Sequence, residues 1–372
     1  MRKAWIVGHS IVSPLGTSTE ENYSYLREGI SGLSSISDSQ LSSDPVFVGR
    51  ITDIAGEAGL SRFEILCRQV LENLTANRQF NPAKTLLILS TTKGNIGFLE
   101  HGQPDHPRIH LHATAAYLAQ MFGFKEHTVI SNACISGVMA LLVGKRMIEH
   151  NRYSNVVIVG ADVLTRFVIS GFQSLQALSS EMCRPFDAAR KGINLGESAA
   201  GIILSATPLE GGENIYIAGG GVSNDANHIS GPSRTGEELA QAISQALKEA
   251  KIDASAVDAI SAHGTATVYN DEMEAKAFNL SNLGKVPVNS LKGYYGHTLG
   301  AAGVLETIVS VHSMTHNELI PTAGFETLGV SQGLNVIKEL RQKPLTTYLK
   351  TASGFGGCNA ALVLKKETKP ES

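Results

Sequence analysis

The chain has 372 residues, of which 42% are hydrophobic and 17% are charged, and its formal net charge at pH 7 is −3. Such a length and apolar fraction are sufficient for a large buried core of two or three domain-sized units. The nearly balanced charge excludes the strongly basic surface of a nucleic-acid-binding protein, and no apolar run approaches the roughly 20 residues that span a bilayer.

Apolar runs of strand length alternate along the chain with stretches of helical periodicity. The predicted strands are residues 4–7, 85–89, 128–131, 156–160, 199–204, 215–218, 259–262, 286–289, 346–351 and 360–364. The predicted helices lie near residues 18–28, 62–76, 111–122, 135–150, 235–250, 271–280 and 300–315. Ser18 and Thr235 are expected to cap the first and fifth helices. The alternation predicts an α/β protein with covered, mostly parallel sheets.

Four sequence patterns recur in the same order along the chain. The helix, strand and polar turn of "FEILCRQVLENL…TLLILSTTKGN" resemble "LAQAISQALKEA…AISAHGTATVYN", and the final pair is "GESAAGII" with "GCNAALVL". Four ordered matches indicate a duplication, with an N-terminal half at 1–206 and a C-terminal half at 213–372. Equivalent strand ends of two such halves are expected to meet at one crevice.

The cysteines and the start of the chain bear on its compartment. The four cysteines form no Cys-x-x-Cys pair, which argues against a disulfide scaffold or a zinc knuckle. The apolar run at residues 4–7 is too short for the hydrophobic region of a signal peptide. We therefore expect a reducing compartment, the cytoplasm.

Residues whose side chains can take part in catalysis lie at the ends of predicted strands. Cys134 lies where a strand turns into a helix, whose N-terminus is expected to lower the pKa of the thiol, although a buried packing role is equally open. His263 lies in "SAHGTAT", and Lys292 and His297 lie in "NSLKGYYGHTLG". Each of these alone is typical of a turn or surface residue. A thiol with two imidazoles and an ammonium suits acyl-thioester chemistry, because imidazoles can stabilise a developing enolate.

Five segments carry a specific family resemblance. They are "NACISG", "PFDAARKGINLGESAAGIIL", "AHGTATVYND", "NSLKGYYGHTLGAAGVLE" and "SGFGGCNAAL". In order and spacing they resemble the elongating β-ketoacyl-[acyl carrier protein] synthases of the thiolase superfamily. The resemblance implies a thiolase-like fold of two duplicated halves in five αβαβα layers. It also implies an acyltransferase that condenses an acyl-enzyme thioester with malonyl-carrier protein in fatty-acid, polyene or polyketide synthesis, without a cofactor or a resident metal.

The resemblance also implies the role of each site residue. Cys134 would be the nucleophile of the N-terminal half. His263 and His297 of the C-terminal half would hold the malonyl thioester carbonyl, promote decarboxylation and stabilise the enolate. Lys292 would order that site, and Glu306 would accompany the lysine.

A glycine-rich turn completes the set that the resemblance implies. The backbone N–H of Phe355 would join that of Cys134 in an oxyanion hole. Gly354 and Gly356 on either side would let this gating turn come close to the substrate. Cys358 stands where the family usually has a small hydroxyl residue, and we interpret it as a packing residue.

The resemblance implies an acyl carrier protein as partner, and a homodimer or a heterodimer with a ketosynthase-like subunit. The alternative function is that of an active or non-condensing subunit in a pair of ketosynthase and chain-length factor. Lys145 and Arg146 could dock the carrier protein or could be ordinary solvated charges.

Two segments depart from the family pattern, so acyl length and the choice of partner subunit stay open. Residues 50–80 are compressed, and the stretch "EHGQPDHPRIHLHATAAYLAQMFGF" is abbreviated. It carries four histidines, His101, His106, His110 and His112. They are interpreted as residues of a solvated loop or an interface, with a metal site as the less favoured alternative.

Overall fold

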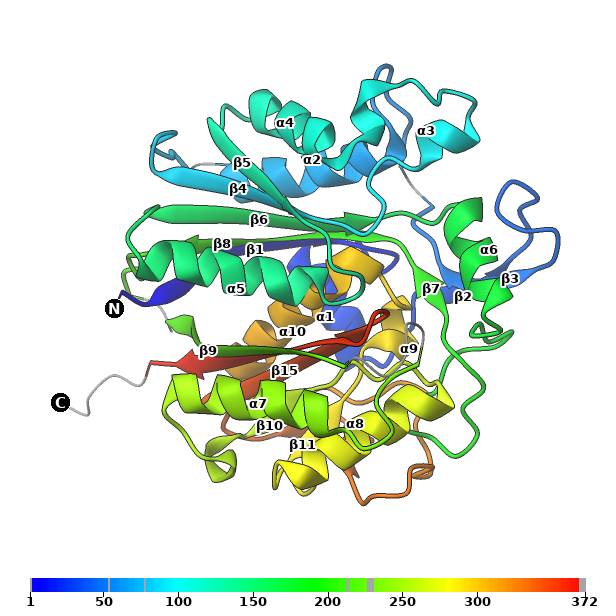
Figure 1. Cartoon of the computed structure of the whole chain (residues 1–372), viewed down its shortest axis with the longest axis vertical. Helices are drawn as coiled ribbons and strands as arrows, with labels where there is room; N and C mark the ends of the chain where they lie inside the picture. The colour runs from blue at the N-terminus through cyan, green and yellow to red at the C-terminus, as the bar shows by residue number, and fades with distance from the viewer. Residues whose placement is uncertain (1, 53, 77, 212–213, 226–230, 368–372) are drawn as a thin grey trace.

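The computed structural model describes residues 2–52, 54–76, 78–211, 214–225 and 231–367. Two portions of β-sheet alternate with three layers of helices (Figure 1). The five-layered αβαβα architecture of the thiolase-like fold is thereby confirmed. Helices α2 (Arg62–Thr75) and α4 (Leu111–Met121) cover one outer face, and α7 (Glu237–Ala250) and α8 (Val268–Leu280) cover the other. Helices α5 (Ser136–Glu149) and α10 (Ala302–His316) fill the middle layer and contact strands of both portions.

The two sheet portions repeat one strand order. The first runs β5-β4-β6-β8-β1, and the second runs β11-β10-β15-β16-β9 and is extended beyond β11 by β13. The strands of the first portion are β1 (Ala4–Val12), β4 (Thr85–Ser90), β5 (Glu126–Ile130), β6 (Asn155–Asp162) and β8 (Ser198–Ser205). Those of the second are β9 (Ile215–Asn224), β10 (Ala259–Ser261), β11 (Pro287–Asn289), β13 (Asn335–Val336), β15 (Thr347–Gly354) and β16 (Cys358–Lys366).

In each portion the five equivalent strands form two parallel pairings followed by two antiparallel ones. In the first, β5, β4 and β6 are parallel neighbours, whereas β8 runs antiparallel to both β6 and β1. In the second, β11, β10 and β15 are parallel, whereas β16 runs antiparallel to β15 and β9. The repeated pattern supports the proposed division at 1–206 and 213–372. The prediction of mostly parallel sheets was wrong, because tight connections such as that between β15 and β16 enforce antiparallel pairing.

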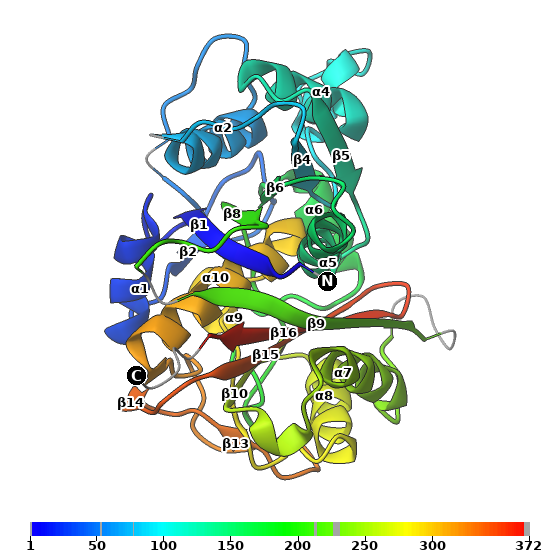
Figure 2. The ribbon, with the colours of Figure 1, turned by 90° about the vertical axis from the view of Figure 1, so that its left-hand side faces the viewer.

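Strands β1 and β9 join the two portions. Ala4 pairs with Ile217 and Trp5 with Tyr216, so that the portions form one continuous sheet of eleven strands among the described residues. Figure 2 shows α10 running between the part with β1 and β8 and the part with β9, β16 and β15. Apolar residues of β1, β8, β15 and β16 form the central hydrophobic core together with residues of α5 and α10.

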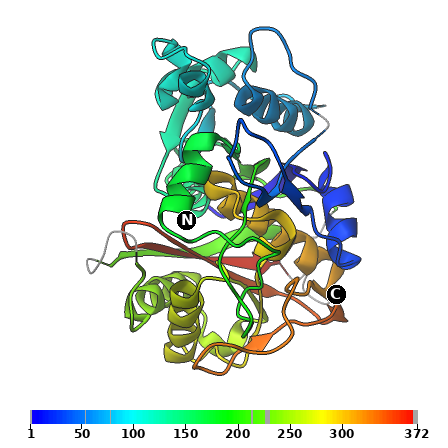
Figure 3. The same cartoon turned by 90° about the vertical axis from the view of Figure 1, so that its right-hand side faces the viewer.

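The remaining elements are short. They are α1 (Thr19–Arg27), α3 (Gly97–Glu100), α6 (Arg166–Ser174), α9 (Lys292–Tyr295), β2 (Leu33–Ile36), β3 (Val46–Gly49), β7 (Leu195–Gly196), β12 (Glu318–Leu319) and β14 (Arg341–Gln342). Strands β2, β3 and β7 form a small sheet, which with α6 occupies the side that faces the viewer in Figure 3. Most of these elements were not predicted, because runs of two to four residues carry no periodicity.

The two predicted helix caps had different outcomes. Ser18 caps α1, because its side chain accepts a hydrogen bond from the backbone N–H of Glu21. The prediction for Thr235 was wrong by one position. Gly236 is the N-cap of α7, and its φ of 80° is in the left-handed region that glycine adopts without strain.

Helices α5 and α10 cross at very close range. A Cβ atom added at Gly137 would lie 2.7 Å from the backbone N of Val304, and one added at Gly303 would lie 2.4 Å from the backbone N of Val138. The Gly/Ala-rich start of α10 therefore packs tightly between the layers.

A further property of the helices concerns membranes. Within the described residues, no helix combines the length and the apolar character that a bilayer crossing requires.

Replacing Gly137 with alanine should lower the free energy of unfolding by about 1–3 kcal/mol, because the new methyl group overpacks the crossing with α10. The change would be measured by urea denaturation. Gly171→Ala is the matched control, because Gly171 lies in α6 with no heavy atom within 4 Å of the added Cβ. Alanine there should stabilise the protein by up to about 1 kcal/mol. The same stabilisation at Gly137 would contradict the close crossing.

Candidate active site

Cys134 lies in a constrained turn between β5 and α5. The hydroxyl of Ser136 accepts a hydrogen bond from the backbone N–H of Asn132 at 2.7 Å and donates one to the carbonyl of Ala133 at 2.6 Å. Ala133 has a φ of 45°, which is costly for a residue with a Cβ atom. These bonds compensate for the strain and fix the direction of the Cys134 side chain.

The two histidines are fixed by their backbones. The N–H groups of His263 and Gly264 donate to the two carboxylate oxygens of Glu274 on α8, at 2.8 and 2.6 Å. The N–H of His297 donates to the carbonyl of Asn194 at 2.7 Å, and its own carbonyl accepts from Gly196 at 3.0 Å. His297 of the C-terminal half is therefore anchored to a strand of the N-terminal half.

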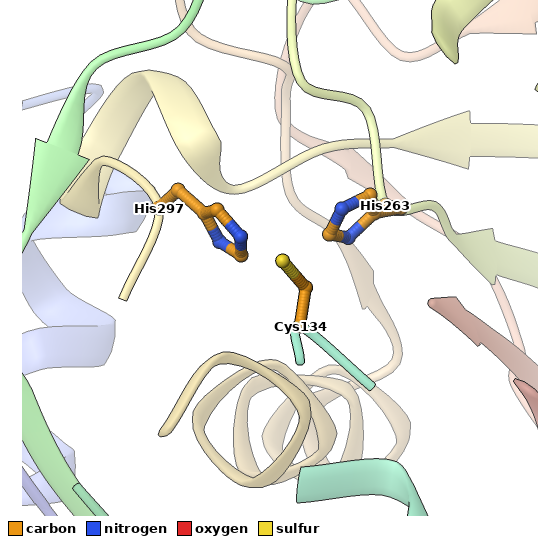
Figure 4. A group of neighbouring side chains, drawn as sticks. All are labelled: Cys134, His263 and His297. Carbon is orange, nitrogen blue, oxygen red and sulfur yellow. The ribbon is translucent and has the colours of Figure 1, made fainter. Parts of the chain in front are cut away.

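The three side chains converge on one point, as Figure 4 shows. The sulfur of Cys134 and one ring nitrogen each from His263 and His297 all lie within 4.8 Å of one another. The ring centroids of the two histidines are 5.2 Å apart. Among the described residues, Nδ1 of His263 and both ring nitrogens of His297 are buried without a hydrogen-bond partner. Buried polar atoms of this kind indicate a place for a ligand.

Beside the histidines lies a buried ionic cluster. Lys292, at the start of α9, forms an ion pair with Oε1 of Glu306 on α10. Nζ of Lys350 on β15 lies 2.6 Å from Oε2 of the same carboxylate. The side chains of Lys292 and Lys350 are 0% exposed and that of Glu306 is 4% exposed. The role of Lys350 was not predicted, although a single lysine inside the strand-like run "TTYLKTASG" was an available signal.

This cluster determines the charge of the site. Burial lowers the pKa of His263 and His297 well below the usual value, and the Lys292 and Lys350 ammonium groups lower it further. Both rings are therefore neutral at physiological pH, and each can donate one hydrogen bond. Burial alone would raise the pKa of Glu306, but the two lysines outweigh it and lower that pKa.

Two ammonium groups around one carboxylate favour negative charge that develops nearby. The ligand set of Cys134, His263 and His297 is one that can bind Zn²⁺. The neighbouring ammonium groups of Lys292 and Lys350 oppose a further cation at this point.

The expectation of a lowered thiol pKa was wrong. Burial raises the pKa of Cys134 to about 12, and the neighbouring Cys358 raises it further. Lys292 and a hydrogen bond from the backbone N–H of Phe355 oppose this rise without cancelling it. In the free protein the residue is a thiol, because the loss of hydration outweighs the helix N-terminus.

The turn between β15 and β16 reaches the nucleophile. A Cβ added at Gly354 would lie 3.0 Å both from the backbone N of Cys134 and from Sγ of Cys358, so a larger residue there would crowd the nucleophile. Gly356 has a φ of 83°, and Phe355 between the two glycines is 40% exposed. Cys358 is buried, as a packing residue would be, and its thiol donates to the carbonyl of Phe355 at 3.4 Å.

A cavity of about 530 Å³ gives access to Cys134, His263 and His297. Its wall is largely apolar and includes Phe172 and Phe355, whose ring centroids are 5.7 Å apart. The cavity can therefore accept an apolar chain that ends in a reactive group next to the thiol.

The four-histidine segment does not form a metal cluster. His106 stacks on Phe98 with centroids 3.8 Å apart, and the rings of His110 and His112 are 5.7 Å apart. Within the part of the chain that the structure describes, only Cys134, His263 and His297 bring three His, Cys, Asp or Glu ligand atoms within 4.8 Å. His110 is the N-cap of α4 and His112 lies in the first turn of that helix.

Lys145 is not available for docking. Its side chain is buried and forms ion pairs with Glu149 and Glu249, both at 2.6 Å. Arg146 contacts the same two carboxylates from the surface. These residues tie α5 to α7, so the docking hypothesis for Lys145 was wrong.

The thiol state of Cys134 can be tested by alkylation of the free protein. Its reaction with iodoacetamide should accelerate about tenfold per pH unit from pH 7 to 9.5 without a plateau, because only the thiolate reacts. Labelling would be followed by intact mass and assigned by peptide mapping, with Cys134→Ala as the control. A plateau below pH 8 would instead show that the helix N-terminus prevails over burial.

Comparison with known proteins agrees with this geometry. Residues 101–208 match the family model of the beta-ketoacyl synthase N-terminal domain, and residues 215–326 match that of the C-terminal domain. A polyketide beta-ketoacyl synthase of Streptomyces halstedii is 31% identical over 328 residues, which cover 78% of this chain and 76% of that protein. The 3-oxoacyl-[acyl-carrier-protein] synthase 2 of Coxiella burnetii is 29% identical over 98% of this chain and 99% of its own.

The fold is similar to solved structures as well. A ketosynthase from Xenorhabdus doucetiae, solved in complex with its chain length factor, superposes with a TM-score of 0.89 at 25% identity. The match covers 98% of each chain.

Proposed function

This chain belongs to the β-ketoacyl synthase family, and from that premise we propose how its residues carry out the condensation. It is an acyltransferase of the ketosynthase class that acts in fatty-acid or polyketide synthesis. The observation that carries the proposal is the convergence of the Cys134 sulfur with the two imidazoles at the end of an apolar cavity.

The first step is acyl transfer from a carrier protein to Cys134. The sulfur attacks the thioester carbonyl while its proton passes to one of the neutral imidazoles within 4.8 Å. The carrier thiolate leaves and takes up that proton. The backbone N–H groups of Cys134 and Phe355 are proposed to bind the oxyanion, which is supported by the hydrogen bond from Phe355 N–H toward the sulfur.

The second step is decarboxylation of a malonyl thioester. The unpartnered ring nitrogens of His263 and His297 donate hydrogen bonds to the malonyl thioester carbonyl. The bond to the carboxylate breaks, CO₂ leaves, and the electron pair forms an enolate whose oxygen stays between the imidazoles. The nearby ammonium groups favour that negative charge, so no strong base is required.

In the third step the enolate carbon attacks the acyl-Cys134 carbonyl. The new carbon–carbon bond forms, the sulfur leaves as a thiolate and takes up a proton from solvent, and the β-ketoacyl chain stays on the carrier protein. Lys292 and Glu306 order the histidines during these steps. Gly354 and Gly356 give the Phe355 gate the freedom to move.

We propose an acyl carrier protein as the substrate-bearing partner and a second ketosynthase-like chain as the subunit partner. Strand β5 forms one edge of the eleven-stranded sheet, and Glu126 and His127 on it are exposed. An edge strand of this kind can pair with a second chain. The solved relative from Xenorhabdus doucetiae is a complex with a chain length factor. The proposed compartment is the cytoplasm.

Because Cys134 and the two histidines have different roles, their substitutions should impair different steps of the reaction. Cys134→Ala should abolish formation of the acyl-enzyme, measured by intact mass after incubation with acyl carrier proteins of several chain lengths. His263→Ala and His297→Ala should lower CO₂ release from malonyl-carrier protein by about 10²–10⁴-fold, because each removes a donor to the developing enolate. Acyl loading should fall much less. Equal loss of loading and decarboxylation in the histidine variants would refute this division.

The subunit partner can be identified by mass. The chain alone has a mass of 39.5 kDa and should form a dimer in light scattering, because an edge strand can pair with its own copy across a two-fold axis. An active homodimer would count against an obligate chain-length-factor partner. A monomer that becomes active only with a Cys-less homologue would support the heterodimer instead.

A further inference from the structure

Lys350 is a fully buried lysine to which the reaction steps above give no role beyond the positive charge that it shares with Lys292. It lies on β15, and its side chain is 0% exposed. It does not line the cavity that leads to Cys134. An ammonium group without water needs close partners, since burying an unpaired charge is strongly unfavourable.

The partners of Lys350 are the groups that support the histidines. Its Nζ donates to the carbonyl of Ser261 at 3.3 Å, of Ala262 at 3.2 Å and of Thr351 at 2.7 Å. Ser261 and Ala262 are the two residues that directly precede His263. Nζ also lies 2.6 Å from Oε2 of Glu306, whose other oxygen binds Lys292. One ammonium group thus links the backbone before His263 to the carboxylate that Lys292 shares.

Charged groups reach Lys350 from several elements. Glu306 comes from α10, Lys292 from α9 and Glu274 from α8, and Glu274 itself binds the N–H of His263. The rings of His263 and His297 also feel its charge. Burial lowers the pKa of Lys350 and Lys292 adds to this, whereas Glu306 and Glu274 oppose the change.

We propose that Lys350 is a positioning residue for decarboxylation, which holds Glu306 and the backbone before His263 in one arrangement. This inference rests on the proposed function. It assigns to the chain a second lysine, distinct from Lys292, that acts through other residues and does not touch the substrate. Acyl loading of Cys134 depends on it much less, because either imidazole alone can take the thiol proton, whereas decarboxylation needs both imidazoles at the malonyl carbonyl.

The consequences of removing the ammonium follow from its contacts. Without it, the carbonyls of Ser261 and Ala262 lose a charged donor and His263 is free to shift. A displacement of about 1 Å at a reacting group can cost on the order of 100-fold in rate. Loss of a positive charge also raises the pKa of His263 and His297, so that protonation begins at higher pH.

The test uses Lys350→Met and Lys350→Gln in the full chain, because glutamine keeps a hydrogen-bond donor if methionine prevents folding. Lys145→Met is the matched control, since Lys145 is an equally buried, ion-paired lysine far along α5. CO₂ release from malonyl-carrier protein and acyl loading of Cys134 would be measured from pH 5 to 9. Thermal unfolding would be recorded for every variant.

The expected result is a fall of about 100-fold in decarboxylation for the folded Lys350 variants, with loading near that of the wild type. The acid limb, which is the fall of the decarboxylation rate at low pH, should begin at a higher pH than in the wild type. A purely structural role would not cause this shift. Lys145→Met should lose stability and keep both activities. Unchanged decarboxylation, or equal loss of both steps with an unmoved acid limb, would overturn the inference. Failure of the wild-type protein to load or decarboxylate would instead reject the proposed function.

Discussion

The close crossing of α5 and α10 determines the geometry on which the site depends. Helix α5 begins two residues after Cys134, and α10 begins shortly after His297. Because Gly137 and Gly303 have no side chains, the two backbones meet at van der Waals distance. Any larger residue at this crossing would separate the thiol from the imidazole. The same helix α10 carries Glu306, so the crossing also positions the carboxylate that forms ion pairs with Lys292 and Lys350.

Burial is the second constraint, and it acts on every titratable group of the site. It keeps the histidines neutral and raises the pKa of the Cys134 thiol, so that the resting site contains neutral reactive groups beside a fixed ionic cluster. Nucleophile activation must then coincide with substrate binding, when proton transfer to an imidazole accompanies bond formation. A site of this kind limits wasteful reactions of a free thiolate with water-borne electrophiles.

Much of the fold could be predicted from the sequence, because its long elements have strong periodicity. All ten predicted strands and all seven predicted helices correspond to elements of the structure, with boundaries shifted by a few residues. Helix α6 was not predicted because the apolar residues of "RFVISGFQS" form no long periodic run. Strand direction was also missed, since an apolar run has the same pattern whichever way its neighbour points.

The site residues could be named from motifs, but their environment could not. The order of Cys134, His263, Lys292 and His297 in the sequence was informative because each follows a strand end. The sign of the thiol pKa change was not, because it depends on how many atoms exclude water from the sulfur. The role of Lys350 was not predicted for a related reason. Its contacts depend on the neighbouring strand, because only the pairing of β15 with β10 brings Lys350 to Ser261 and Ala262.

The pairing of β1 with β9 has a consequence for how the duplicated halves behave. Backbone hydrogen bonds cross the boundary between the halves, so the halves cannot open around a substrate by a hinge motion. Motion that admits an acyl chain must come from small loops such as the one that carries Phe355. If the two halves were separate chains, β1 and β9 would each have an unpaired edge that can associate with other strands. This favours keeping the two copies on one chain.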